Sequence, residues 1–161
     1  ILRAGPHAAL LTSAVHEGHP AHAVSDIQKT GSLGAVDLMA ARREQVNVGP
    51  LGENLHFSIS HTKHHVFCVL RSHPVGIDAE EKDRDVDLRL ADKILSPTEK
   101  AQYDNAPDKR EALLKFWVLK EAAGKCTGQG INGYPNKTEF SLQDPRLTEV
   151  DGCFVAIIEE N

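Results

Sequence analysis

Val75-Gly76-Ile77-Asp78-Ala79-Glu80 is one of two stretches that decide the fold of this chain, and Phe116-Trp117-Val118-Leu119-Lys120-Glu121-Ala122-Ala123-Gly124-Lys125 is the other. The first predicts a strand that carries Asp78 and Glu80 on one face, because side chains two apart in an extended chain point the same way. The second predicts a helix with Glu121 and Lys125 on one face, four residues apart. If the two faces meet, three carboxylates and one ammonium share a pocket.

Such a group of acids needs a counter-charge. Three carboxylates repel one another unless a divalent cation neutralises them, and oxygen ligands in this number suit Mg²⁺ or Mn²⁺. Lys125 would then be free to hold a phosphate. The simpler alternative is a solvated strand face beside a surface Glu/Lys pair on a helix. Gly76, two residues before the first acid, and the apolar run that leads to Glu121 favour the shared pocket.

Four segments together resemble a known family. They are 57–62 (Phe-Ser-Ile-Ser-His-Thr), 76–80 (Gly-Ile-Asp-Ala-Glu), 116–125 (quoted above) and 128–130 (Gly-Gln-Gly). In this order they resemble the signature of the 4′-phosphopantetheinyl transferases. The Ser-His element upstream of the Gly-Ile-Asp segment is similar to the larger, Sfp-type branch and not to the small trimeric holo-acyl-carrier-protein synthases. The resemblance runs from residue 55 to residue 140.

The resemblance implies an α+β fold, in which two antiparallel-sheet-plus-helix halves are related by a pseudo-twofold axis. We expect a single transferase domain over 1–161, with approximate halves 1–73 and 74–161. The chain begins at Ile1 and is shorter than is usual for the branch. The N-terminal half is therefore expected to be short or incomplete.

The resemblance also implies a reaction. These enzymes move the 4′-phosphopantetheine arm of coenzyme A to a serine of an acyl or peptidyl carrier protein and release adenosine 3′,5′-bisphosphate. By motif position, Asp78, Glu80 and Glu121 would bind the metal, which bridges the pyrophosphate of coenzyme A. Lys125 would add a positive charge on the same pyrophosphate, and Glu121 is also the candidate base for the attacking serine.

Further positions are implied to bind coenzyme A. Ser60 falls where the family faces the pyrophosphate, and His61 where it faces the 3′-phosphate. The family's Gly-Lys-Pro element is missing, because 48–53 reads Val-Gly-Pro-Leu-Gly-Glu. Arg42 and Arg43 are the candidates for the 3′-phosphate, and a solvated helix end is their alternative interpretation.

Composition limits the partners and the compartment. The 161 residues carry a formal net charge of −5, which argues against a general nucleic-acid binder. A carrier protein is commonly acidic, so its docking surface should be locally basic or apolar, and the candidates are Lys109, Arg110 and Lys115. The three cysteines lack C-x-x-C spacing and suit a reducing compartment. The longest apolar runs are too short to cross a bilayer, so we expect a soluble, cytoplasmic protein without membrane contact.

Periodicity and turn residues predict the elements. We expect helices over 34–46, 88–95 and 109–125, and a further helix that starts at Ser96 with Glu99 closing a capping box. We expect strands over 55–60, 66–71 and 75–80, joined as a meander, and late strands over 138–142 and 153–159.

Three alternatives remain at this point. A structural zinc site could use His56, His61, His64 and His65, but their spacing lacks the firm pattern and cysteine partners of such sites. A Mg²⁺-dependent nucleotide phosphohydrolase could use the same carboxylates with water as nucleophile. A non-catalytic coenzyme A or carrier-protein binding module would have little need of Asp78, Glu80, Glu121 and Lys125 together.

Overall fold

Two antiparallel sheets and a group of helices make up the described part of the chain. The structure is a computed structural model that describes residues 3–4, 8–14, 46–47, 54–130 and 138–160. The described strands pair in the orders β1-β2-β5-β4-β3 and β6-β8-β7. Their bounds are β1 Arg3–Ala4, β2 Ala8–Ala14, β3 Val46–Asn47, β4 Asn54–His61, β5 His65–Arg71, β6 Val75–Glu81, β7 Leu147–Val150 and β8 Cys153–Glu159. The predicted α+β class with antiparallel sheets is confirmed.

The predicted strands over 55–60 and 66–71 form the hairpin β4–β5. Ile59 pairs with Cys68 and His61 with Val66 in its register. The turn of the hairpin is tied to the end of β6, because the Glu81 carboxylate accepts hydrogen bonds from the Thr62 hydroxyl at 2.8 Å and the His64 amide at 2.9 Å. The hairpin is thereby fixed against the second sheet.

The predicted meander is wrong at its third strand. β6 leaves the first sheet after β5 and pairs with β8, with Asp78 opposite Ala156. On its other edge, β6 faces two serine hydroxyls of β4. The amide of Ile77 donates to Ser58 Oγ at 3.0 Å, and the amide of Ala79 donates to Ser60 Oγ at 3.1 Å. These buried hydroxyls satisfy N–H groups that a neighbouring strand would otherwise pair with, so the two sheets can separate here.

The helices follow the predicted signals. Their bounds are η3 Leu88–Leu90, α2 Ala91–Ile94, α3 Pro97–Asn105 and α4 Lys109–Thr127. Ser96 and Glu99 form the expected capping box at the start of α3. Asp108 caps the start of α4, and Gly128 ends it with φ 71°, in the left-handed region that favours glycine. None of the described helices is long and apolar enough to span a membrane.

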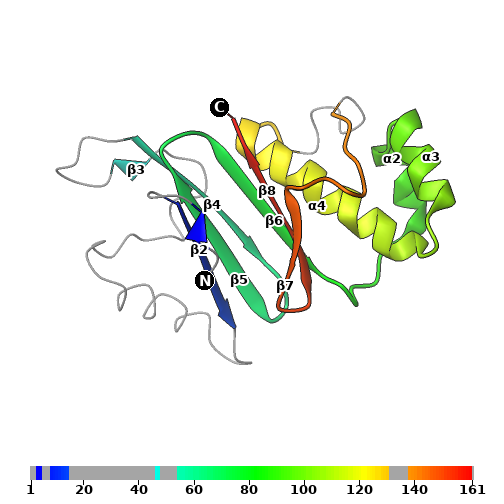
Figure 1. Cartoon of the computed structure of the whole chain (residues 1–161), viewed down its shortest axis with the longest axis horizontal. Helices are drawn as coiled ribbons and strands as arrows, with labels where there is room; N and C mark the ends of the chain where they lie inside the picture. Colours follow the sequence, from blue (N-terminus) through cyan, green and yellow to red (C-terminus); the bar gives the residue numbers. More distant parts are fainter. Residues whose placement is uncertain (1–2, 5–7, 15–45, 48–53, 131–137, 161) are drawn as a thin grey trace.

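α4 lies along β6 and β8, with α2 and α3 gathered at its N-terminal end (Figure 1). One hydrophobic core fills the space between α4 and the second sheet, and another lies between the two sheets, with residues of β5 on one side and of β6 and β8 on the other. Helix and strand approach closely at Gly76, where an added Cβ would lie 1.9 Å from the carbonyl oxygen of Ala122. Only glycine therefore allows this packing, which brings the acids of β6 beneath α4.

The predicted strand over 138–142 is wrong, because this segment packs against helices and its amides bind side chains. Glu99 accepts the Phe140 amide at 2.9 Å, and Gln102 accepts the Leu142 amide at 3.1 Å. The fully buried Glu99 also pairs with Lys120 of α4 at 2.8 Å. The strand beside β8 is β7, within a region that the sequence predicted only as a connection. The helix predicted over 34–46 lies outside the described residues except for Val46, which begins β3.

Candidate active site

Asp78 lies at the centre of the candidate site. Its side chain is buried on β6, with the residue 6% exposed. Its Oδ1 atom accepts hydrogen bonds from the Ser60 hydroxyl at 2.9 Å and from the Lys125 ammonium at 2.7 Å. Its Oδ2 atom is buried and has no hydrogen-bond partner among the described residues. A buried carboxylate oxygen without a partner costs free energy, so Oδ2 is a natural place for a bound cation.

Lys125 joins three elements at this point. Besides the Asp78 carboxylate, its ammonium donates to the carbonyl of Ile77 at 3.1 Å and to that of Ile59 at 3.4 Å. The side chain is 31% exposed. The sequence predicted Lys125 to be free for a phosphate, whereas here its ammonium neutralises Asp78 and links α4 to β6 and β4.

Glu80 lies two residues beyond Asp78, where β6 meets the middle of α4. Its carboxylate forms an ion pair with the Arg84 guanidinium and accepts a hydrogen bond from the Trp117 side chain. Burial raises the pKa of Glu80 above its ordinary value. The Arg84 charge opposes this shift, while the negative charge of Asp78 adds to it.

Glu121 completes the predicted set from the helix side. It is one turn of α4 away from both Trp117 and Lys125. Burial raises the pKa of the Glu121 carboxyl, and the Asp78 charge raises it further, against the opposing charges of Lys125 and Arg84. The predicted acids of β6 and α4 thus lie close enough to influence one another's protonation.

These residues fit a divalent cation in chemistry but are not arranged around one. Carboxylate oxygens suit Mg²⁺ or Mn²⁺, and Asp78 Oδ2 is unpartnered. However, no three His, Cys, Asp or Glu side chains of the described part of the chain stand close enough together to hold a metal ion. Lys125 and Arg84 instead pair with Asp78 and Glu80. A cation would therefore be held by Asp78, Glu80 and Glu121 only after a rearrangement of side chains.

The positions predicted to bind coenzyme A differ in their surroundings. Ser60 is buried, and its hydroxyl is used by Asp78 and the Ala79 amide, so it positions an acid of the site. His61 is exposed at the end of β4. Arg42 and Arg43 lie outside the described residues. The contacts of these four residues with coenzyme A stay predictions.

Arg84 and Trp117 are site residues that sequence reasoning missed. Trp117 could have been found, since it precedes Glu121 by four residues and Lys125 by eight, which puts all three on one stripe of α4. Arg84 carried no such signal, because it belongs to a loop in which most residues are charged. Only the turn after β6, closed by the Arg84 amide and the Glu81 carbonyl at 3.0 Å, brings it back to Glu80.

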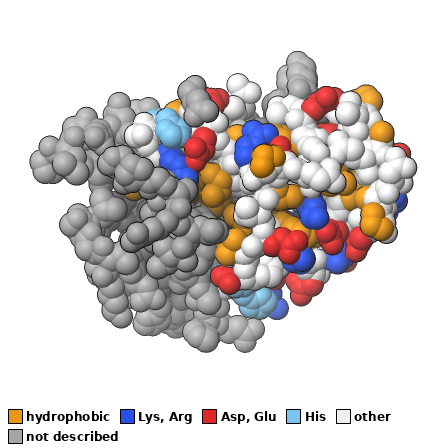
Figure 2. Space-filling view, viewed as in Figure 1, with side chains coloured by type: hydrophobic (Ala, Val, Ile, Leu, Met, Phe, Trp, Pro, Cys, Tyr) orange, Lys and Arg blue, Asp and Glu red, His pale blue; other side chains and the backbone are white. Residues whose placement is uncertain are grey.

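The basic residues proposed for carrier docking have partners within the chain. Lys109 donates to the carbonyls of Tyr103, Asp104 and Ala106 at the end of α3, at 2.7 to 3.0 Å. Lys115 pairs with Glu111 at 2.6 Å. Arg110 donates to the backbone carbonyls of Lys82 and Arg84. On the face shown in Figure 2, acidic and basic side chains are interspersed.

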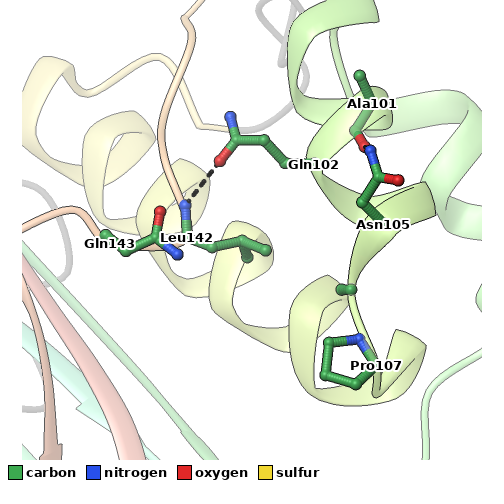
Figure 3. A pocket seen from close by; sticks show the side chains of 7 residues that line it. Ala101, Gln102, Asn105, Pro107, Leu142 and Gln143 are labelled. Carbon is green, nitrogen blue, oxygen red and sulfur yellow. Dashed lines mark hydrogen bonds between the residues drawn. The ribbon is translucent and has the colours of Figure 1, made fainter.

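A shallow hollow lies apart from the residues of the candidate site. It is formed by the end of α3 and the segment that follows Phe140 (Figure 3), and is lined by Ala101, Gln102, Asn105, Ala106, Pro107, Leu142 and Gln143. Its amides have local partners, since Gln102 binds the Leu142 amide and Asn105 donates to the Ala101 carbonyl at 2.8 Å. None of the residues predicted for catalysis or binding lines it.

The comparisons with known proteins agree with this geometry. The family model of the 4'-phosphopantetheinyl transferase superfamily matches residues 74–154, a stretch that contains both acids of β6 together with Glu121 and Lys125. The chain belongs to this family.

Its curated relatives include Sfp-type enzymes. The 4'-phosphopantetheinyl transferase Sfp of Bacillus subtilis (strain 168) is 38% identical over 80 residues, which cover 48% of this chain and 35% of Sfp. The 4'-phosphopantetheinyl transferase psf-1 of Bacillus pumilus is 34% identical over 98 residues, 59% of this chain and 42% of psf-1. A 4'-phosphopantetheinyl transferase of Bacillus subtilis is 32% identical over 114 residues, 66% of this chain and 50% of that protein. The chain thus spans half or less of the length of these relatives, and the predicted Sfp-type resemblance is confirmed.

Proposed function

We propose that this chain transfers the 4′-phosphopantetheine arm of coenzyme A to a serine of an acyl or peptidyl carrier protein. The observation that carries the proposal is the meeting of two motifs, in which Asp78 of β6 and Lys125 of α4 are 2.7 Å apart. A solvated strand face and a surface helix pair would not bury Asp78 beneath the helix. Family membership supports the same reaction.

In the proposed reaction, the serine oxygen attacks the phosphorus that carries the pantetheine arm. The bond from that phosphorus to the adenosine 3′,5′-bisphosphate breaks, and this bisphosphate leaves. Glu121 is the candidate acceptor of the serine proton, because it is half-buried beside Asp78. When bound, Mg²⁺ or Mn²⁺ would draw negative charge from the pyrophosphate. Asp78, Glu80 and Glu121 would hold this cation.

We further propose that the chain is one domain of two halves, 1–73 and 74–161, of the pseudo-twofold kind found in Sfp-type enzymes. In support, the strands change sheets in the turn between β5 and β6. The first half would contribute Ser60, His61 and the pair Arg42 and Arg43 to the binding of coenzyme A.

The test is incubation of the protein with coenzyme A, Mg²⁺ and an apo carrier protein, followed by mass spectrometry of the carrier. Addition of the phosphopantetheine mass supports the transferase. Cleavage of coenzyme A without carrier modification would support the phosphohydrolase, and tight binding without turnover would support the binding module.

Variants connect the result to the site. We expect Asp78→Asn and Glu121→Gln to lose transfer while the fold remains. Glu111→Gln is the matched control, because Glu111 is another acid of α4 with a lysine four residues later, and it lies outside the 116–125 motif. Equal losses in Glu121→Gln and Glu111→Gln would contradict the proposed role of Glu121.

A further inference from the structure

We propose that Arg84 is an internal counter-ion of the candidate metal site, which competes with the divalent cation for Glu80 and so sets the affinity of the metal. The inference rests on the proposed function, because it takes Asp78, Glu80 and Glu121 as the metal ligands. It concerns a residue outside the predicted site.

The position of Arg84 is fixed by its surroundings. Its amide closes a turn with the Glu81 carbonyl at 3.0 Å, directly after β6. Its own carbonyl accepts a hydrogen bond from the Arg110 guanidinium of α4 at 3.4 Å, and the same guanidinium also binds the carbonyl of Lys82. The loop is therefore held against α4, which directs the Arg84 side chain toward the acids of the site.

Arg84 and Lys125 each neutralise one of the three acids. The Arg84 guanidinium forms an ion pair with the Glu80 carboxylate, directly beyond the end of β6. The Lys125 ammonium forms an ion pair with the Asp78 carboxylate in the same way. Three carboxylates thus face two basic groups, so most of the negative charge of the site is already compensated by the chain itself.

This compensation has a consequence for the metal. A cation can take Glu80 as a ligand only if the guanidinium gives up the same carboxylate, and the positive charge of Arg84 then repels the ion. The side chain of Arg84 is 46% exposed, so it can turn into solvent without unfolding the chain. An ion pair of this exposure is worth a fraction of a kcal/mol to about 1 kcal/mol, and its removal should strengthen metal binding about two- to fivefold.

The chain contains its own reporter for this exchange. Trp117 is the only tryptophan in the sequence, and its side chain donates a hydrogen bond to Glu80. Titration of the full chain with Mg²⁺ or Mn²⁺ alone should therefore change the tryptophan fluorescence. The signal of free Mn²⁺ in electron paramagnetic resonance gives the same affinity independently.

The variants to compare are Arg84→Gln and Arg89→Gln. Arg89 also lies in a charged segment, but it pairs with Asp87 and its side chain is 89% exposed. Both substitutions remove one positive charge. We expect the Kd for the metal to fall about two- to fivefold in Arg84→Gln and to stay unchanged in Arg89→Gln.

The possible results separate the two proposals. Metal binding by the wild-type chain, with equal affinities in both arginine variants, would overturn the role of Arg84 and leave the metal site standing. Wild-type binding that is weak and insensitive to Asp78→Asn would instead overturn the metal site itself, and the inference with it. Matching circular dichroism spectra of all variants ensure that these comparisons are made on folded protein.

Discussion

Ser60 and Ser58 offer a matched test of how the structure holds Asp78. Both hydroxyls are buried on β4, and both accept an amide of β6. Only the Ser60 hydroxyl also donates to the Asp78 carboxylate, at 2.9 Å. Substitution of each serine by alanine therefore removes the same backbone contact, and one variant removes the contact with the acid in addition.

The magnitudes follow from these contacts. Ser58→Ala leaves the buried Ile77 amide unpaired, which costs about 1–3 kcal/mol of the free energy of unfolding. Ser60→Ala leaves the Ala79 amide unpaired at a similar cost. It also removes a hydrogen bond to a carboxylate in an ion pair, worth about 1.5–3 kcal/mol more. For a chain of this size, Ser60→Ala should melt about 3–12 °C below Ser58→Ala.

Thermal unfolding followed by circular dichroism, at neutral pH and with a chelator present, measures this difference. Equal melting temperatures of the two variants would refute the argument that Ser60 holds Asp78. A double-mutant cycle adds a second check. In an Asp78→Asn background the extra cost of Ser60→Ala should shrink, because the partner it serves is no longer a carboxylate.

Three further predictions concern the frame around the site. Gly76→Ala should lower the stability by about 1–3 kcal/mol or more in urea titration, because its Cβ would lie 1.9 Å from the Ala122 carbonyl oxygen; an unchanged midpoint would contradict the close packing. Lys120→Met should cost about 3–5 kcal/mol by leaving Glu99 buried without its counter-charge. The double variant Glu99→Gln/Lys120→Met should recover part of that loss, because glutamine removes the uncompensated charge and keeps an oxygen for the Phe140 amide; no recovery would mean that the charge is not the cause. Burial raises the pKa of Cys68 and of Cys153 to about 11, so at pH 8 only about one thiol in a thousand is ionised. Both should resist iodoacetamide in the native protein and react faster as the pH rises toward 11, as peptide mass spectrometry would show, and rapid native labelling at pH 8 would contradict these raised pKa values.

Sequence reasoning succeeded where a pattern is local. The capping box at Ser96, the hairpin β4–β5 and the helix α4 depend on residues a few positions apart, and all three are present. It failed at 138–142, where apolar and polar residues suggest a strand. Glu99 and Gln102 lie on a helix distant in sequence, and they take the backbone amides that a strand would use.

The same distinction applies to the site. Spacing alone put Asp78 and Glu80 on one strand face and Glu121 and Lys125 on one helix face, and their motifs identified the family. The sequence could not predict the partner of each acid. Lys125 and Arg84 neutralise the acids and Ser60 donates a hydrogen bond, and these three residues come from three different parts of the fold. Periodicity in a chain reports which side chains share a face of one element. Only the packing of α4 on β6, permitted by the absence of a side chain at Gly76, decides which faces meet and which charges are paired.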